Sequence, residues 1–235
     1  TGTEQLADKS WLIKTDKGNI KTEVVINAAG LWGREVGKMA GLDLPLLPAE
    51  HQYFVTETIP EIESIGRRLP SIADRDGEYY LRQEGNGLLV GAYEKDVKLW
   101  AEVETPSGFG HELFPDDLDR IEENVLRAIS RVPVLGGAGI KRVINGPMIW
   151  SPDSNALFGP VPELDGYYLC NGIIPGFSQS GGLGELLAEW IITGEPHLDI
   201  FSWDLARFGT WADKKFTKSR VKDQYSNRFA IHYPN

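Results

Sequence analysis

The chain is poor in cysteine, and this limits the kinds of site that it can hold. Only one of its 235 residues is a cysteine, Cys170, so no disulfide can form within the chain. Cys170 follows the apolar residues 167–169, where a lone thiol is most simply a small buried hydrophobic side chain. The four histidines and this cysteine show no spacing typical of metal ligands. The sequence therefore predicts neither a disulfide framework nor a metal site.

Long hydrophobic runs and an excess of positive charge are also lacking. No apolar run is long enough to span a membrane, and no signal peptide is visible. The 34 acidic residues outnumber the 24 basic ones, and the formal net charge of -10 disfavours a nucleic-acid partner, because an acidic surface repels phosphates. We expect a reducing compartment, either the cytoplasm or, in a eukaryote, the mitochondrial matrix.

What is present is an ordinary globular composition, with 41% hydrophobic and 25% charged residues. The pattern at the start predicts a strand at residues 11–15, a tight turn, a second strand at 20–27 and a helix near 33–39. The apolar end of the second strand is typical of a strand covered on both faces.

The middle of the chain has the pattern of an antiparallel sheet. Residues 52–57, 78–83 and 88–93 alternate or are rich in β-branched and aromatic side chains, and the turn at 84–87 is a strong hairpin signal. A helix opened by residues 115–117 follows, because apolar side chains recur at helical spacing; they are Leu118, Ile121, Val125 and Ile129. A further strand is expected at 141–144.

The last third begins with residues 146–160, which are rich in turn-forming side chains and predict a loop. A short strand at 166–170, a glycine-rich loop at 171–182 and a helix from about 183 to 193 follow. The expected division of this α/β (α+β) chain is a partial cofactor-binding domain at 1–48, a substrate domain with an antiparallel sheet at 49–145, a return to the first domain at 146–194, and an aromatic-rich segment at 195–235.

Two strand-to-helix junctions are candidate ligand sites. At residues 24–32 small side chains leave the backbone open to close approach, and at 172–184 a glycine-rich stretch leads into a helix whose first N–H groups attract negative charge. For the first junction a tight structural turn without a ligand is the favoured interpretation, because a lone Ala-Ala-Gly is a weak signal. The second favours a ligand and a structural turn about equally.

His51 is the best candidate for a general base, because imidazole titrates near neutrality. In strand alternation Tyr79 and Leu81 share one face, while Tyr80 and Arg82 share the other. One face is therefore able to offer a phenol to a substrate. From the residues alone, a hydrogen-bonded core histidine and surface aromatics are the favoured reading.

Taken together and in order, several segments resemble the D-amino-acid oxidase superfamily of FAD-dependent oxidoreductases, and within it the dimethylglycine/sarcosine dehydrogenase branch. The matching segments are residues 25–37, 50–53, 79–84, 145–147, 151–153, 181–184, 189–191 and 194–196.

This resemblance implies FAD as cofactor and oxidative demethylation of an N-methyl amino acid, such as dimethylglycine or sarcosine, by hydride transfer to the flavin. It implies that His51 and Tyr79 form a catalytic pair beside the flavin. It also implies cofactor contacts at Trp32 and at a second set of residues. These are Ile173, Ile174, Pro175, Gly176, Phe177 and Ser178.

The superfamily's Gly-x-Gly-x-x-Gly motif and its flavin-tethering histidine do not occur in this sequence; by resemblance both lie upstream, and a folate-binding domain lies downstream. Because the sequence opens at Thr1, close to a strand pattern, we expect a piece of a longer chain. The expected partners are a small amine and an electron-acceptor protein. The alternatives are a binding or interaction module without its own cofactor, and a related glycine or D-amino-acid oxidase.

Overall fold

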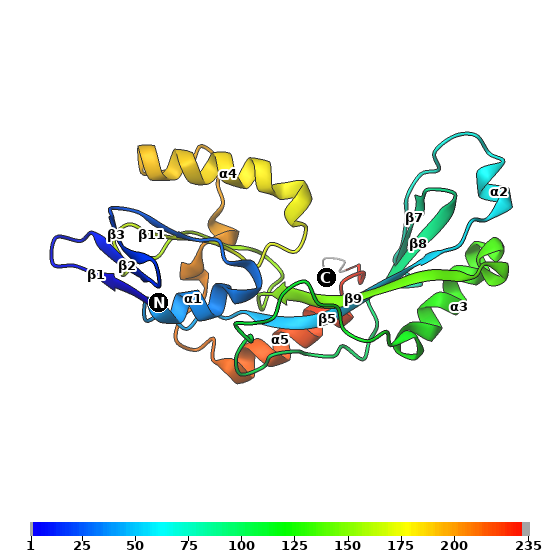
Figure 1. Ribbon diagram of the computed structural model, residues 1–235, viewed down its shortest axis with the longest axis horizontal. Coiled ribbons are helices and arrows are strands. Elements are labelled where there is room, and N and C mark those ends of the chain that lie inside the picture. The colour runs from blue at the N-terminus through cyan, green and yellow to red at the C-terminus, as the bar shows by residue number, and fades with distance from the viewer. Residues whose placement is uncertain (1, 232–235) are drawn as a thin grey trace. The chain divides into compact units, whose positions relative to one another are not determined.

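Contacts between residues divide the chain into two units, and the computed structural model describes residues 2–231 of it (Figure 1). Unit 1 contains the described residues up to Pro48, together with Ala101–Gly108 and Met148–Val221. Unit 2 contains Ala49–Trp100, Phe109–Pro147 and the described residues from Lys222 onward. Each unit is built from strands and helices, so the chain has the mixed α/β class that the sequence predicts, with antiparallel sheets.

Unit 1 has two small sheets. The first is the meander β1 (Gly2–Gln5), β2 (Trp11–Thr15) and β3 (Gly18–Thr22). The second has the order β10 (Leu157–Pro160), β11 (Tyr167–Asn171) and β4 (Val25–Asn27), in which β4 runs parallel to β11. The helices are α1 (Gly33–Met39), α4 (Gly176–Thr193) and the first part of α5 (Lys214–Ser226), with the short 3-10 turns η1 (Gly30–Trp32), η4 (Phe201–Trp203) and η5 (Leu205–Arg207).

The single strand expected at residues 20–27 is wrong, because it is two strands in two sheets. β3 pairs with β2 as far as Thr22, and the backbone N–H of Val25 then donates to Gly166 O at 2.9 Å, which brings β4 to β11. The expectation that this strand is covered on both faces also fails among the described residues, since Ile26 is 48% exposed.

Residues 146–160 are not one loop. β9 (Ile140–Trp150) extends six residues past the expected end, and β10 begins at Leu157. The turn-forming residues occupy only the short connection, where Ser151 Oγ donates to Asn155 O at 2.6 Å. Leu157 and Phe158 are fully buried, so burial decides the strand where local turn composition predicts a loop.

The helix expected from about residue 183 begins at Gly176. Its glycines do not delay it, because Leu183, Leu186 and Leu187 on one side are buried and fix the helix from its middle. The last part of the expected glycine-rich loop, residues 176–182, therefore forms the first two turns of α4.

Unit 2 is organised around a five-stranded sheet of order β6 (Ile72–Asp74), β7 (Tyr79–Glu84), β8 (Gly87–Ala92), β5 (Leu47–Thr56) and β9. The pairs β6–β7, β7–β8 and β8–β5 are antiparallel, as predicted, and Tyr80 lies opposite Gly91. The helical elements are α2 (Pro60–Glu63), η2 (Leu118–Ile121), α3 (Glu122–Arg131) and η3 (Pro133–Gly137).

The core of unit 2 lies between this sheet and α3, which runs beside the strands in Figure 1. Its fully buried members include Tyr79, Leu88, Val90, Ile121 and Ala128. The apolar stripe predicted along residues 118–129 is thus the face that packs on the sheet, which confirms the helical spacing seen in the sequence.

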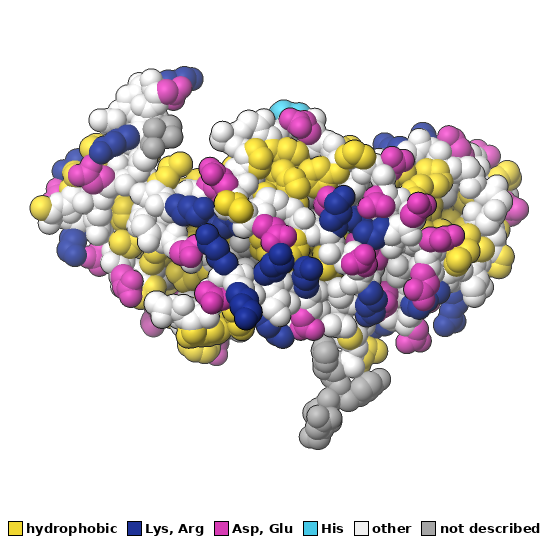
Figure 2. Space-filling view, turned by 90° about the horizontal axis from the view of Figure 1, so that it is seen from below, with side chains coloured by type: hydrophobic (Ala, Val, Ile, Leu, Met, Phe, Trp, Pro, Cys, Tyr) yellow, Lys and Arg dark blue, Asp and Glu magenta, His cyan; other side chains and the backbone are white. Residues whose placement is uncertain are grey.

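Figure 2 shows a surface on which acidic and basic side chains are interspersed, with hydrophobic side chains reaching the surface between them. Among the described residues, no helix has both the length and the hydrophobicity needed to cross a membrane. Of the aromatic-rich segment, residues 232–235 lie outside the described part.

Candidate functional site

His51 lies on β5 of unit 2, partly buried, with a phenol at each ring nitrogen. Its Nε2 lies 3.0 Å from the hydroxyl of Tyr80, and its Nδ1 lies 3.1 Å from the hydroxyl of Tyr225 on α5. The ring of Tyr93 stacks on the imidazole with a centroid distance of 4.6 Å. The imidazole is therefore held in one orientation by two hydrogen bonds and one stacking contact.

The strand register makes room for this arrangement. Tyr80 lies opposite Gly91, and a Cβ at that position would come within 2.2 Å of the Tyr80 ring and hydroxyl. The missing side chain lets the Tyr80 ring lie across β8 and reach His51 on β5. Any larger residue at position 91 would displace the phenol.

The electrostatics keep the three groups neutral. Burial, with the nearby charge of Arg120, lowers the pKa of His51 to about 4, so the imidazole is uncharged at neutral pH. Burial raises the pKa of Tyr80 above its usual value, and burial also raises that of Tyr225. Both hydroxyls are consequently protonated throughout the physiological range.

Behind Tyr225 lies a buried ion network. The Tyr225 hydroxyl donates to Glu94 Oε2 at 2.9 Å, and Glu94 Oε1 forms an ion pair with Arg120 Nε at 2.9 Å. Arg120 Nη1 also lies 3.3 Å from Glu50 Oε2. All three charged side chains are buried, and desolvation raises the pKa of the Glu94 carboxyl.

Tyr79 occupies a different place from the one that the resemblance implies. It points from β7 into the hydrophobic core of unit 2 and is fully buried, next to Asp74. Tyr80, its neighbour on the other face of the strand, is the residue that contacts His51. In this structure the phenol on β7 that contacts His51 is therefore that of Tyr80 and not that of Tyr79, because successive strand residues point to opposite faces.

The residues that the sequence predicts to contact the cofactor lie in unit 1, after the ends of two neighbouring parallel strands. β4 ends at Asn27 and β11 ends at Asn171, and the Nδ2 group of Asn171 donates to Asn27 O at 2.8 Å. Asn27 Nδ2 in turn donates to Gly33 O at 2.9 Å. The structure thus brings two junctions that lie far apart in the sequence to one edge of a sheet, where α/β folds bind ligands.

At one glycine of each junction the backbone is open. Nothing described lies within 4 Å of a Cβ built at Gly30 or at Gly176, the first residue of α4. Phe177 is fully exposed, Ser178 is exposed, and Trp32 is partly buried with its Nε1 donating to Pro106 O at 3.0 Å. The remaining expected contacts, Ile173, Ile174 and Pro175, form the connection between β11 and α4.

Sequence reasoning missed Tyr225 and Glu94. Tyr225 lies 174 residues after His51, and no local pattern connects the two. Glu94 lies two residues after the apolar end of β8, where a carboxylate close to a buried strand is a recognisable signal of a paired or functional charge. Among the described residues, no group of three or more potential metal-ligating side chains is close enough to hold an ion.

Comparison with known proteins shows the family to which the chain belongs. A model of the FAD dependent oxidoreductase family matches residues 1–190, and a model of the FAD dependent oxidoreductase central domain matches residues 193–235. The chain belongs to the family of FAD-dependent oxidoreductases of the D-amino-acid oxidase type.

Within that family, the chain is 42% identical over 239 residues to rat (Rattus norvegicus) mitochondrial dimethylglycine dehydrogenase, covering 100% of this chain and 28% of that protein. It is 37% identical to mouse (Mus musculus) mitochondrial sarcosine dehydrogenase, covering 95% of this chain and 24% of that protein. In structure it is similar to an L-proline dehydrogenase from P. horikoshii, with a TM-score of 0.71, 28% identity, and coverage of 88% of this chain and 53% of that one. The chain thus spans about a quarter of the length of the dimethylglycine and sarcosine dehydrogenases that it matches.

The residues present fit part of a flavin nucleotide site. The family's cofactor is FAD, and the open strand ends at Asn27 and Asn171, with the uncapped start of α4 at Gly176, supply backbone groups without side chains in the way. The α4 N-terminus presents N–H groups, which favour the negatively polarised oxygens of a ligand.

Proposed function

We propose that this chain is part of an FAD-dependent oxidoreductase that oxidatively demethylates an N-methyl amino acid, such as dimethylglycine or sarcosine. Two relatives support the substrate class, because their names are dimethylglycine dehydrogenase and sarcosine dehydrogenase. The observation that carries the proposal is His51, a neutral imidazole held between two phenols.

The cofactor contacts of the proposal lie in unit 1. Trp32 and the connection at residues 173–178 would hold FAD, through backbone groups at the ends of β4 and β11. When bound, FAD would supply the hydride-acceptor chemistry, and the protein would supply position and electrostatics.

The role of His51 in this proposal is to help remove the proton of the substrate ammonium, since only the neutral amine releases a hydride readily. With a pKa of about 4, the His51 imidazole is neutral at neutral pH. Its Nε2 lone pair is therefore free to accept a hydrogen bond from the Tyr80 O–H. Tyr80, the more exposed of the two phenols, is the group that receives the substrate's proton as it passes its own to His51.

A visible absorption spectrum tests the proposal. The purified chain with FAD, and the complete polypeptide that carries it, are mixed anaerobically with dimethylglycine, sarcosine, glycine or a D-amino acid. The proposal expects bleaching of the flavin by an N-methylated amine, faster than by glycine. Bleaching by glycine or a D-amino acid alone would support the related oxidase instead.

Two tyrosine variants sharpen this experiment. Tyr80→Phe is expected to slow flavin reduction by about 100-fold, because it removes the hydroxyl that hydrogen-bonds to His51 Nε2. Tyr79→Phe is the matched control on the neighbouring position, and it is expected to leave the reduction rate within about twofold, since its hydroxyl lies in the core. Equal effects of the two variants would contradict the assignment of Tyr80.

A second candidate function is an interaction module that does not hold its own cofactor. The exposed Phe177 and Ile26 favour it, because they leave apolar surface at the β4–α4 end of unit 1. No flavin spectrum in the complete polypeptide, with a stable partner complex, would support it. We further propose, from the family resemblance, an electron-acceptor protein and a linked folate-binding domain as partners. The word mitochondrial in the relatives' names supports a mitochondrial location in a eukaryote, and we propose a cytoplasmic one otherwise.

A further inference from the structure

The hydrogen bonds around His51 have a definite direction. The Tyr225 hydroxyl donates its only proton to Glu94 Oε2, so toward His51 its oxygen is an acceptor. The Nδ1 atom of His51, 3.1 Å away, must therefore carry the ring proton. Nε2 is then an acceptor, and it faces the Tyr80 hydroxyl at 3.0 Å.

From this geometry we propose that Tyr80, His51, Tyr225 and Glu94 form a proton relay, in which Glu94 is the terminal acceptor for the proton that the amine substrate loses. This relay rests on the proposed function for its substrate, although the hydrogen-bond chain itself does not.

The transfer balances without an additional reagent. The substrate N–H bond breaks and its proton goes to Tyr80 Oη, while the Tyr80 proton goes to His51 Nε2. His51 passes its Nδ1 proton to Tyr225 Oη, and Tyr225 passes its own to Glu94 Oε2. The substrate changes from cation to neutral amine, Glu94 changes from carboxylate to carboxylic acid, and His51 changes tautomer without acquiring a charge.

The charge distribution suits an acceptor at Glu94 better than one at His51. Burial lowers the basicity of the imidazole but raises the proton affinity of the Glu94 carboxyl. Arg120 opposes an imidazolium and, by its ion pair at 2.9 Å, fixes Glu94 in place without occupying Oε2. Asp117, which lies near Arg120, also acts on Glu94 and raises the pKa of its carboxyl.

The neighbouring elements hold the chain of groups together. His51 faces Tyr80 of β7, Tyr93 after β8, and Tyr225 of α5, and it lies on β5 two residues before Tyr53. These neighbours are phenols, so Arg120 is the charge that acts on the imidazole from η2.

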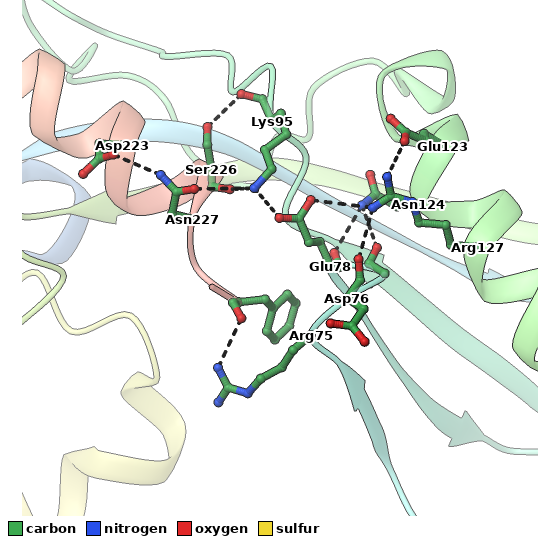
Figure 3. A network of polar contacts seen from close by, with 12 residues as sticks. Arg75, Asp76, Glu78, Lys95, Glu123, Asn124, Arg127, Asp223, Ser226 and Asn227 are labelled. Carbon is green, nitrogen blue, oxygen red and sulfur yellow. Dashed lines mark hydrogen bonds and ion pairs between the residues drawn. The ribbon is translucent and has the colours of Figure 1, made fainter. Parts of the chain in front are cut away.

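The end of α5, which carries Tyr225, is held in place by a network of polar contacts. In Figure 3, Lys95 reaches Ser226 and Asn227 on one side and Glu78 on the other. Lys95 Nζ donates to Ser226 O at 2.7 Å, Ser226 Oγ donates to Lys95 O at 2.7 Å, and Lys95 forms an ion pair with Glu78. Because Ser226 follows Tyr225, this network fixes the phenol beside Glu94.

The first test is the tautomer of His51, read from ring nitrogen signals in ¹⁵N NMR of the whole chain, with His51→Gln identifying the signals. The relay expects a proton on Nδ1 and none on Nε2. Tyr225→Phe should shift the population toward the Nε2–H form, while Glu94→Gln should preserve Nδ1–H, because its amide oxygen still accepts from Tyr225. A wild-type ring protonated on Nε2 would overturn the relay.

The second test is anaerobic flavin reduction of the holoenzyme across pH. Tyr225→Phe and Glu94→Gln are each expected to lower the rate by about 100-fold, and Glu94→Asp to restore part of it. The wild-type rate should fall as pH drops through the raised pKa of Glu94, and Glu94→Gln should remove that dependence. Glu50→Gln, which neutralises the other buried carboxylate on Arg120, is the matched control, and its effect should be several-fold smaller.

The two hypotheses fail in different ways. If the wild type reduces its flavin but both variants match it at every pH, the relay is wrong and the proposed function stands. If no amine reduces the flavin, the proposed function fails, and the tautomer measurement alone decides the hydrogen-bond chain.

Discussion

The candidate site residues of unit 1 and those of unit 2 include different kinds of buried polar group. Unit 2 encloses a histidine, two carboxylates and an arginine that are connected by hydrogen bonds and ion pairs. At the strand ends of unit 1 the buried polar groups are neutral, with Asn27 and Asn171 bonded to backbone oxygens. Under the proposed function this difference would separate two tasks, since proton transfer needs titratable groups and cofactor contact needs open backbone.

The largest loss of stability is expected when Arg120, the cation shared by Glu50 and Glu94 in unit 2, is removed. Arg120→Met is expected to lower the free energy of unfolding by about 3–5 kcal/mol, because it leaves Glu50 and Glu94 buried without their shared counter-charge. Urea denaturation followed by circular dichroism measures this loss.

The matched control in unit 1 is Arg207→Met. Arg207 Nε binds Asp153 Oδ2 at 2.7 Å, but Asp153 is partly exposed and is able to regain water. A loss of about 1–2 kcal/mol is expected. Equal losses at the two arginines would contradict the contrast between the units.

The stability of unit 2 should also depend on pH through His51. Its folded-state pKa of about 4 lies below the unfolded value of 6.5, so the unfolded chain binds the proton first as pH falls. The His51 contribution is fully present above pH 6.5 and is lost progressively between 6.5 and 4. Between pH 7 and pH 5 this amounts to about 2 kcal/mol.

Denaturation of the wild type and of His51→Gln at pH 7 and pH 5 measures the effect. The glutamine variant should lose about 2 kcal/mol less than the wild type over this interval. The same pH dependence in both would show that His51 is not buried in neutral form.

The smallest change in stability is expected at the open end of unit 1. Phe177→Ser should change the free energy of unfolding by less than about 0.5 kcal/mol, since the ring is fully exposed, yet it should weaken FAD binding in the holoenzyme. Leu187→Ala, on the buried side of the same helix, should cost about 2–5 kcal/mol. Unchanged FAD affinity in Phe177→Ser, measured by flavin fluorescence, would remove Phe177 from the cofactor site.

Local patterns were sufficient for much of the fold. The spacing of Leu118, Ile121, Val125 and Ile129 predicted the helical segment on the core of unit 2, and the turn at 84–87 predicted the β7–β8 hairpin, because both depend on interactions between near neighbours. The same reasoning failed at Leu157, whose strand is decided by burial against distant residues. It also failed at Gly176, where buried leucines further along the helix outweigh the glycines.

The candidate site shows the same division between what local patterns predict and what distant contacts decide. Alternation correctly placed Tyr79 and Tyr80 on opposite faces, and His51 was recognisable as a titratable group on a strand. The sequence alone did not indicate which face meets His51, because both neighbours are tyrosines and the answer depends on the pairing of β7 with β8 and on the space above Gly91. The resemblance names Tyr79, whereas the phenol that contacts the imidazole in the structure belongs to the next residue, Tyr80.

By itself, the sequence determined the α/β class, the family and the antiparallel sheet of the middle segment, since these depend on short-range periodicity and on ordered motifs. Tertiary structure alone decided that α5 brings Tyr225 to His51 across 174 residues, and that Glu94 stands behind it. The physical reason is that a hydrogen bond requires its two atoms to lie about 3 Å apart. Only the packed chain sets such a distance between residues so far apart in sequence.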